Sequence, residues 1–297
     1  MMKHTLYILL IFLFTGLNAQ IGSSNQGFSS SIGRGVGVET NAGVNYNDSA
    51  DALFLRFASE PPKSLKVAIS QWYDTIQKYH IDDSLDLTYC FAVDVTGNAV
   101  ISWIGRKTAT LVNSPTFTAY EGYLTDGASS YIKANYNPVT DKVHLRLDGV
   151  SMAIYIRTNT IVDGYNLAGI HDGTNLLYMR CRASDLLFRI NSTNYSTLTH
   201  SGTISGFTLA NRPNSTQTRN SRNGGTYVVN AVNSVAIPNQ ADGIYIGTIN
   251  SEGSSLSPIA EQFAFFHIGG DLTQTQATKL FQADERFLDT FGKGIVP

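Results

Sequence analysis

From residue 114 onward, short apolar or alternating runs are separated by Gly, Asn, Asp, Ser and Pro. Runs of about four to eight residues divided in this way are typical of β-strands joined by turns. No helical pattern interrupts them, so they indicate an antiparallel sandwich or jelly roll rather than a parallel sheet. The predicted strands are 117–123, 131–134, 143–147, 153–157, 165–171, 176–182, 185–190, 206–211, 226–230, 243–248 and 262–268.

Two segments have the spacing of amphipathic helices. The first opens at Pro61-Pro62 and carries apolar residues at steps of three and four as far as Tyr79. The second follows a cap at Asp271 or Thr273 and ends at Gly292. Between them, residues 85–95 and 99–104 are apolar and could form short helices or strands. We therefore predict a small helical subdomain at 50–112 and a jelly roll with a C-terminal helix at 113–297.

The N-terminus has the layout of a secretory signal peptide. Lys3 precedes an apolar run at residues 5–16, and a small residue, Ala19, precedes a cleavage position at Gln20. The alternative is an uncleaved anchor, but the run is shorter than the ~20 residues that span a bilayer. We predict a signal at 1–19, a Gly/Ser/Asn-rich linker or arm at 20–49, and no membrane span after cleavage. The protein would then be secreted or cell-surface.

Charge and cysteine content exclude some functions. The chain has 21 basic and 23 acidic residues, without the Lys/Arg clusters that bind phosphate backbones, so a nucleic-acid partner is not expected. Charged residues make up 15% of the chain, against a usual ~25%; Gly, Ser, Thr and Asn replace them. Cys90 and Cys181 could pair in an exported protein, or both could be buried free thiols.

Several blocks resemble a known family. Residues 85–89, 101–105, 112–119 and 122–132 resemble bacteriophage, prophage and bacterial surface proteins in which a helical unit precedes a concanavalin A-like (LamG-like) jelly roll. Residues 211–224, 245–247 and 263–270 resemble the closing strands of that family. The resemblance covers about residues 50–295. It implies surface recognition, often of glycans, on virion tails, spikes or fibres. A signal peptide is rare in the phage members and favours a bacterial surface protein.

No catalytic signature stands out. Laminarinase-type sandwich glycosidases carry Glu-x-Asp-x-x-Glu on one strand, which places the carboxylates on one face, and this spacing is missing from the sequence. Asp284 and Glu285 are adjacent on the predicted last helix, so they should point apart. None of the six histidines forms a His-x-x-x-His pair, and His267 on an apolar strand favours a structural role. We therefore predict that the protein is not an enzyme.

The predicted recognition site lies in a polar loop at 213–225, since loops carry function on rigid sandwiches. Its ligand-binding candidates are Arg212, Arg219, Arg222 and Asn223. An unconstrained turn region would look the same, and Asn223-Gly224 is itself a hairpin signal. The many tyrosines of the β-part could stack on sugars, although most should be half-buried.

Calcium is the cofactor that the loops could hold. Asp126, Asp172 and Asn175 lie in Gly-containing turns and could offer oxygen ligands to Ca²⁺. The alternative, which the composition favours, is that Asp-Gly is simply good turn chemistry.

Three functions remain open. The first is a non-catalytic recognition or adhesion protein, extracellular or on a virion surface, that binds a surface glycan or host-surface receptor through jelly-roll loops. The second is a structural virion or surface-assembly component, in which the jelly roll forms a homo-oligomer. The third is a secreted polysaccharide-acting hydrolase.

Overall fold

The computed structural model describes residues 44–297. The predicted signal peptide (1–19) and most of the predicted linker (20–49) lie outside the described residues. The described helices are α1 (Asp48–Phe54), α2 (Lys63–Lys78), α3 (Thr96–Ala99) and α4 (Gln274–Asp289). Thr273 caps α4 in a capping box with Gln276, as its sequence predicts. None of the helices in 44–297 combines the length and apolarity of a bilayer span.

The first sheet has eight strands and carries the helices. Its antiparallel order is β13 (Val228–Ala231), β12 (Gln217–Arg222), β11 (Gly206–Asn214), β6 (Val150–Ile156), β17 (Gln262–Gly269), β4 (Gly122–Leu124) and β3 (Thr116–Thr118). Strand β1 (Leu85–Cys90) also pairs with β17. The apolar run at 85–95, left open between helix and strand, thus contributes a strand to the sandwich.

The second sheet has nine strands. Its order is β10 (Ser196–Thr199), β9 (Asp185–Ile190), β8 (Leu176–Cys181), β7 (Tyr165–His171), β14 (Tyr245–Ile246), β5 (Tyr131–Lys133) and β2 (Thr110–Val112). Strand β15 (Ile249–Ser251) runs parallel to β7 and pairs with β16 (Ser254–Leu256). The prediction of a mainly β sandwich with helices before and after it is confirmed.

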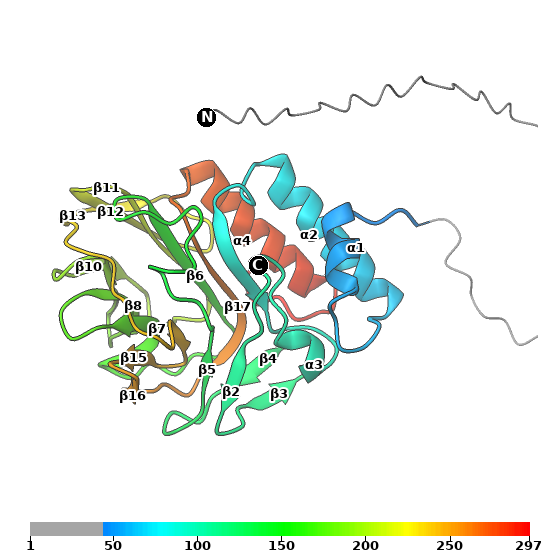
Figure 1. The fold of residues 1–297 in the computed structure, drawn as a ribbon, viewed down its shortest axis with the longest axis horizontal. Helices are drawn as coiled ribbons and strands as arrows, with labels where there is room; N and C mark the ends of the chain where they lie inside the picture. Colours follow the sequence, from blue (N-terminus) through cyan, green and yellow to red (C-terminus); the bar gives the residue numbers. More distant parts are fainter. Residues whose placement is uncertain (1–43) are drawn as a thin grey trace, which may run out of the picture. The chain divides into compact units, whose positions relative to one another are not determined.

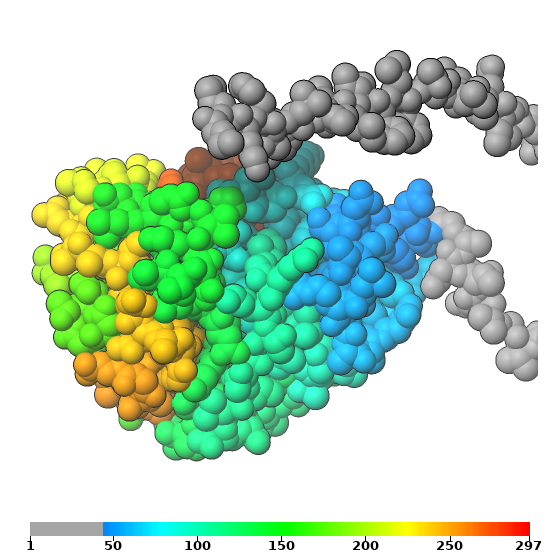
Figure 2. Space-filling model, viewed as in Figure 1, coloured from blue at the N-terminus to red at the C-terminus, as the bar shows by residue number. Residues whose placement is uncertain are grey.

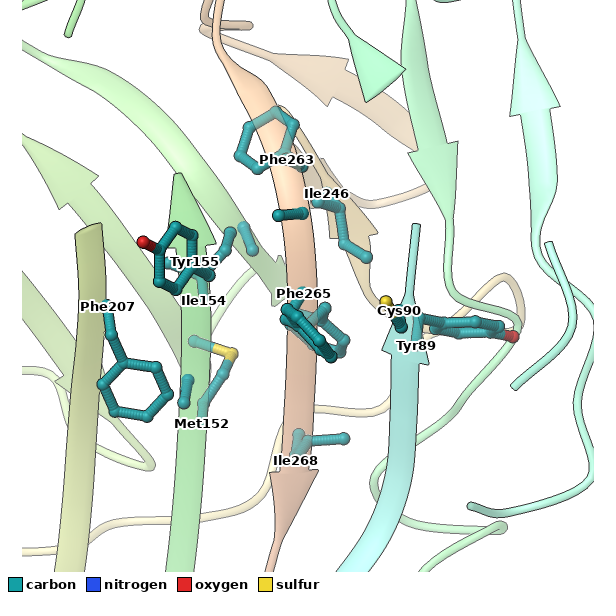
Figure 3. Packing of buried hydrophobic residues seen from close by; sticks show 14 of the residues in the cluster. Tyr89, Cys90, Met152, Ile154, Tyr155, Phe207, Ile246, Phe263, Phe265 and Ile268 are labelled. Atoms are coloured by element: carbon teal, nitrogen blue, oxygen red, sulfur yellow. The ribbon is translucent and has the colours of Figure 1, made fainter. Parts of the chain in front are cut away.

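Helices α2 and α4 pack on the outer face of the first sheet (Figure 1). Strand β17 lies between β6 and β1 (Figure 3). All of its residues are buried, because helices cover one face of the sheet and the second sheet covers the other. Phe265 packs against Trp103 and Phe287 on the helical side. Tyr89, on the opposite side, donates a hydrogen bond to the carbonyl of Ala134. Residues 45–297 form one compact unit, of which Figure 2 shows one face.

Two strand predictions differ from the structure. Residues 143–147 form no strand, because the Asp86 carboxylate accepts the backbone N–H groups of Val143, His144 and Leu145. Those donors are therefore not available to a ladder. The run 117–123 is a hairpin, β3–β4, instead of one strand; Tyr120 in its turn has a φ of 60°.

Candidate functional site

Strands β8 and β9 place one group of polar side chains on the outer face of the second sheet. Alternation sends Leu177 and Met179 into the core and Tyr178 and Arg180 to the opposite face. Across the ladder, Tyr178 is paired with Arg189 and Arg180 with Leu187, so these four side chains share that face. Tyr195, just before β10, joins them. We call Tyr178, Arg180, Arg189 and Tyr195 the arginine–tyrosine cluster.

The cluster is tightly organised around Arg189. The Arg189 guanidinium carbon lies 4.0 Å from the ring centroid of Tyr195 and 5.9 Å from that of Tyr178, which are cation–π distances. The Tyr178 hydroxyl donates to the Tyr195 hydroxyl at 3.2 Å. Tyr195 keeps 38% of its surface exposed, whereas Tyr178 is buried. The cluster therefore offers solvent a pre-oriented aromatic ring beside a fixed cation.

The positive charge of the cluster is not neutralised locally. Within residues 44–297, no carboxylate lies within ion-pair distance of Arg180 or Arg189. The Nε atoms of both arginines are buried and have no hydrogen-bond partner in this part of the chain. Burial alone would raise the pKa of Tyr195, but the hydrogen bond from Tyr178 and the charges of Arg189 and Arg180 outweigh it and lower that pKa. The two guanidinium groups therefore have no anionic partner among residues 44–297.

Sequence reasoning missed this cluster. It noted Tyr178 and Tyr195 among many tyrosines, but it did not single out Arg180 or Arg189. A usable signal was present: the charged residues occupy alternate positions in two adjacent apolar strands, which places them on one face.

Arg212 does not lie on a surface loop. It is fully buried in β11, and its guanidinium donates to the carbonyls of Ile190 (2.7 Å) and Val232 (2.8 Å) and also to Asn214 and Gln217. The region predicted as a recognition loop, 213–225, is largely the β11–β12 hairpin. Arg212 is buried because its guanidinium donates to main-chain carbonyls of several segments at this end of the sandwich. These hydrogen bonds join the segments.

The other three ligand-binding candidates are dispersed. Arg222 donates to the carbonyls of Thr203 and Ser205. Asn223 uses its side-chain oxygen to accept the Phe207 N–H, with a φ of 48° in a turn. Arg219 is half-buried on β12. Asn223 and Gly224 both have positive φ, as the hairpin signal requires, but the connection from β12 to β13 is longer than two residues.

The calcium candidates serve as turn acceptors. One Asp126 oxygen accepts the backbone N–H groups of residues 128, 129 and 130, and these bonds lower the pKa of Asp126. Asp172 accepts backbone N–H groups of Asn175 and Asn239 and also the Asn175 amide. Among the described residues, no three His, Cys, Asp or Glu side chains gather as a metal site. Calcium binding stays a prediction without an acidic cluster to carry it.

A buried polar network links α2 and α4 to the first sheet. Trp72 Nε1 donates to Asp284 at 2.9 Å, His267 Nε2 lies 2.9 Å from the other Asp284 oxygen, and Thr88 Oγ1 lies 3.1 Å from His267 Nδ1. The residue types and their order resemble a hydroxyl–imidazole–carboxylate relay. Each of the four is at most 1% exposed, so a substrate cannot reach the hydroxyl. The structural role predicted for His267 is confirmed.

The two cysteines are also buried. Cys90 and Cys181 are free thiols in the structure. Burial raises the pKa of Cys181 to about 11, and that of Cys90 well above its ordinary value. Both are therefore held as neutral thiols, which are poor nucleophiles.

Comparisons with known proteins bear on the fold. No family model and no curated protein matches the chain. The binding domain of botulinum neurotoxin serotype C1 is similar in structure, with a TM-score of 0.53 and 13% identity over 69% of this chain and 53% of that one. A structure addressing the interaction of botulinum neurotoxin type C with two ganglioside molecules gives 0.52 and 12% over 70% and 53%. The serotype D/C VPI 5993 binding domain gives 0.51 and 13% over 69% and 53%.

The chain thus spans about half the length of these neurotoxin domains. Similarity at such identities shows a shared β-sandwich fold. The comparisons show neither a phage nor a LamG family.

Proposed function

We propose that this protein is a non-catalytic extracellular recognition module that binds acidic glycans through the arginine–tyrosine cluster. The observation that carries the proposal is the partly exposed ring of Tyr195 beside Arg180 and Arg189, two arginines that have no carboxylate partner within residues 44–297. Aromatic rings stack on the apolar faces of sugars. Guanidinium groups bind carboxylates through paired hydrogen bonds. A sugar bearing a carboxylate would use both features together.

The location of the cluster suits this role. It lies on the sheet face away from α2 and α4, so a long glycan chain could lie across the strands. Binding of gangliosides, which are acidic glycolipids, by a neurotoxin of similar fold supports the coarser idea that such sandwiches serve glycan recognition. The predicted signal peptide suggests a secreted or cell-surface location, with a virion surface as the alternative.

The test is a glycan array probed with residues 20–297, with and without Ca²⁺, followed by titration calorimetry on the best acidic glycan and its neutral counterpart. Arg189→Gln should weaken binding about 10- to 100-fold, because a charged hydrogen bond contributes ~1.5–3 kcal/mol. Tyr195→Ala should weaken acidic and neutral forms alike. Arg286→Gln, at an exposed arginine of α4, is the matched control and should bind normally.

Two outcomes would contradict the proposal. One is an array without any bound acidic glycan. The other is an Arg189→Gln variant with unchanged affinity. Light scattering on the same sample would reveal a stable oligomer, the property expected of an assembly component. Release of reducing sugar from mixed polysaccharides would indicate a hydrolase.

A further inference from the structure

A separate hollow lies where α1 and α2 meet residues 103–106. Its volume is about 260 Å³. Its charged wall residues are Arg56, Asp82 and Arg106, and its aromatic ones are Tyr73 and Trp103. Figures 1 and 2 show α1 at one end of the described unit, and the strands β8–β10 of the arginine–tyrosine cluster at the other end in Figure 1. We call it the Arg56–Arg106 hollow.

Two arginines, Arg56 and Arg106, line this hollow. In the described part of the chain, neither Arg56 nor Arg106 forms an ion pair, although Asp82 belongs to the same wall. Arg56 donates a single long hydrogen bond to the Ser102 hydroxyl at 3.3 Å. Burial lowers the pKa of Arg56, and the charge of Arg106 acts in the same direction. Arg56 is half-buried and Arg106 is exposed, so two positive charges at this hollow favour the approach of an anion.

The backbone holds Arg106 in place. Arg106 has a φ of 50°, in the left-handed region that is costly for a residue with a side chain. Gly105 before it has a φ of 91°, and a Cβ there would lie 2.3 Å from the Asp86 carbonyl. Ser102 closes the turn through hydrogen bonds with Lys107. The close approach and these bonds fix the backbone of the turn that carries Arg106, whose side chain is exposed.

The aromatic wall is equally rigid. Tyr73 donates its hydroxyl hydrogen to the Trp103 carbonyl at 2.6 Å, and the Trp103 ring packs edge-on against Trp72 at 5.0 Å. Trp103 is only 4% exposed, and its buried indole N–H has no acceptor among the described residues. Such an unsatisfied buried donor is uncommon in folded proteins.

We propose that the Arg56–Arg106 hollow binds a small sugar acid, with the two guanidinium groups pairing with its carboxylate and the Tyr73–Trp103 wall contacting its ring. The volume is below the ~300–1,000 Å³ of sites for drug-sized ligands, which suits one ring better than a chain. The guanidinium pair selects a carboxylate over a neutral sugar. This inference does not depend on the arginine–tyrosine cluster.

Intrinsic tryptophan fluorescence can test this site alone. The chain has two tryptophans, Trp72 and Trp103, and both belong to this aromatic group. The arginine–tyrosine cluster contains none. Residues 20–297 would be titrated with sodium glucuronate, with glucose as the neutral control and sodium chloride as the ionic control. We expect a saturable change with glucuronate alone.

Substitutions of the two arginines test whether the fluorescence change arises from binding at the Arg56–Arg106 hollow. Arg56→Gln and Arg106→Gln should each raise the glucuronate Kd at least about tenfold, whereas Arg286→Gln, at an exposed arginine of α4, should leave it unchanged. Circular dichroism would show that each variant is folded, and Arg56→Lys serves as a milder second variant. An unchanged Kd in both Gln variants would overturn the assignment, as would the absence of any saturable response to glucuronate. Failure of Arg189→Gln to affect glycan binding would bear only on the proposed function.

Discussion

The buried network around Asp284 allows a quantitative test of how the helices are fixed to the sheet. Asp284 accepts hydrogen bonds from Trp72 Nε1 and His267 Nε2, and all three side chains are buried. Asp284→Leu keeps a similar volume but leaves both donors without an acceptor. Each unsatisfied buried donor costs ~1–3 kcal/mol, so the free energy of unfolding should fall by about 2–6 kcal/mol.

Asp284→Asn tests the contribution of the hydrogen bonds of Asp284 separately from that of its negative charge. The Asn oxygen can still accept from Trp72, and its amide can donate to His267 if the imidazole takes its other tautomer. His267 Nδ1–H would then donate to the Thr88 hydroxyl, which can accept as well as donate. Every partner remains satisfied, so we expect a loss of at most about 1.5 kcal/mol.

Thermal unfolding followed by circular dichroism and tryptophan fluorescence would measure both effects. In a unit of this size, 1 kcal/mol shifts Tm by ~2–4 °C, so Asp284→Leu should lower Tm by roughly 4–24 °C. Asp289→Leu, at an exposed carboxylate of the same helix, is the control and should change Tm little. The reasoning fails if Asp284→Leu behaves like this control, or if Asn is as damaging as Leu.

Three further predictions concern buried polar groups. Arg212→Met should lower the free energy of unfolding by about 2–4 kcal/mol in urea titrations, while the folded protein keeps its glycan affinity. Asp86→Ala should speed amide hydrogen exchange at residues 143–145, because their N–H groups lose the carboxylate that accepts them. Burial raises the pKa of Glu285, so the native state holds its proton more tightly than the unfolded state, and the stability contribution of this group falls as pH rises from the ordinary pKa through the raised one. Urea unfolding between about pH 4 and 7 should therefore show Glu285→Gln gaining on the wild type as pH rises; a constant difference would refute this.

The features that could be predicted from the sequence are local ones. The helical spacing that ends at Tyr79 and the cap at Thr273 identify α2 and α4, since a buried stripe and a cap leave their mark within a few residues. Alternating runs identify most strands of the second sheet. The pairing of β1 with β17 joins residues such as Thr88 and His267, which are far apart in the chain. No local pattern encodes that partnership, so the sequence leaves 85–95 open between helix and strand.

The burial of Arg212 illustrates why the predicted recognition loop at 213–225 is instead largely a hairpin. Residues 212–223 are rich in Asn, Ser, Thr and Arg, a composition typical of exposed loops. In the structure Thr218, Asn220 and Ser221 are buried on β12, and Asn220 donates across to Ser196 of the second sheet. Polar contacts join the two sheets at this end of the sandwich. The polar residues of this segment are therefore buried, although their composition is typical of an exposed loop.

The hydrogen bonding of the arginines favours ligand recognition on strands instead of loops. Arg212, inside the sandwich, donates to four backbone carbonyls, among them those of Ile190 and Val232, although its Nη2 has no partner among the described residues. Among the described residues, Arg180 and Arg189 have no acceptor at their buried Nε atoms and no carboxylate within ion-pair distance. Holding two cations in that condition costs stability, and a rigid sheet can carry this cost where a loop would relax. The contrast between an arginine that donates to four carbonyls and two arginines that have no ion-pair partner in the described residues favours the β8–β9 face as the place where an acidic ligand binds.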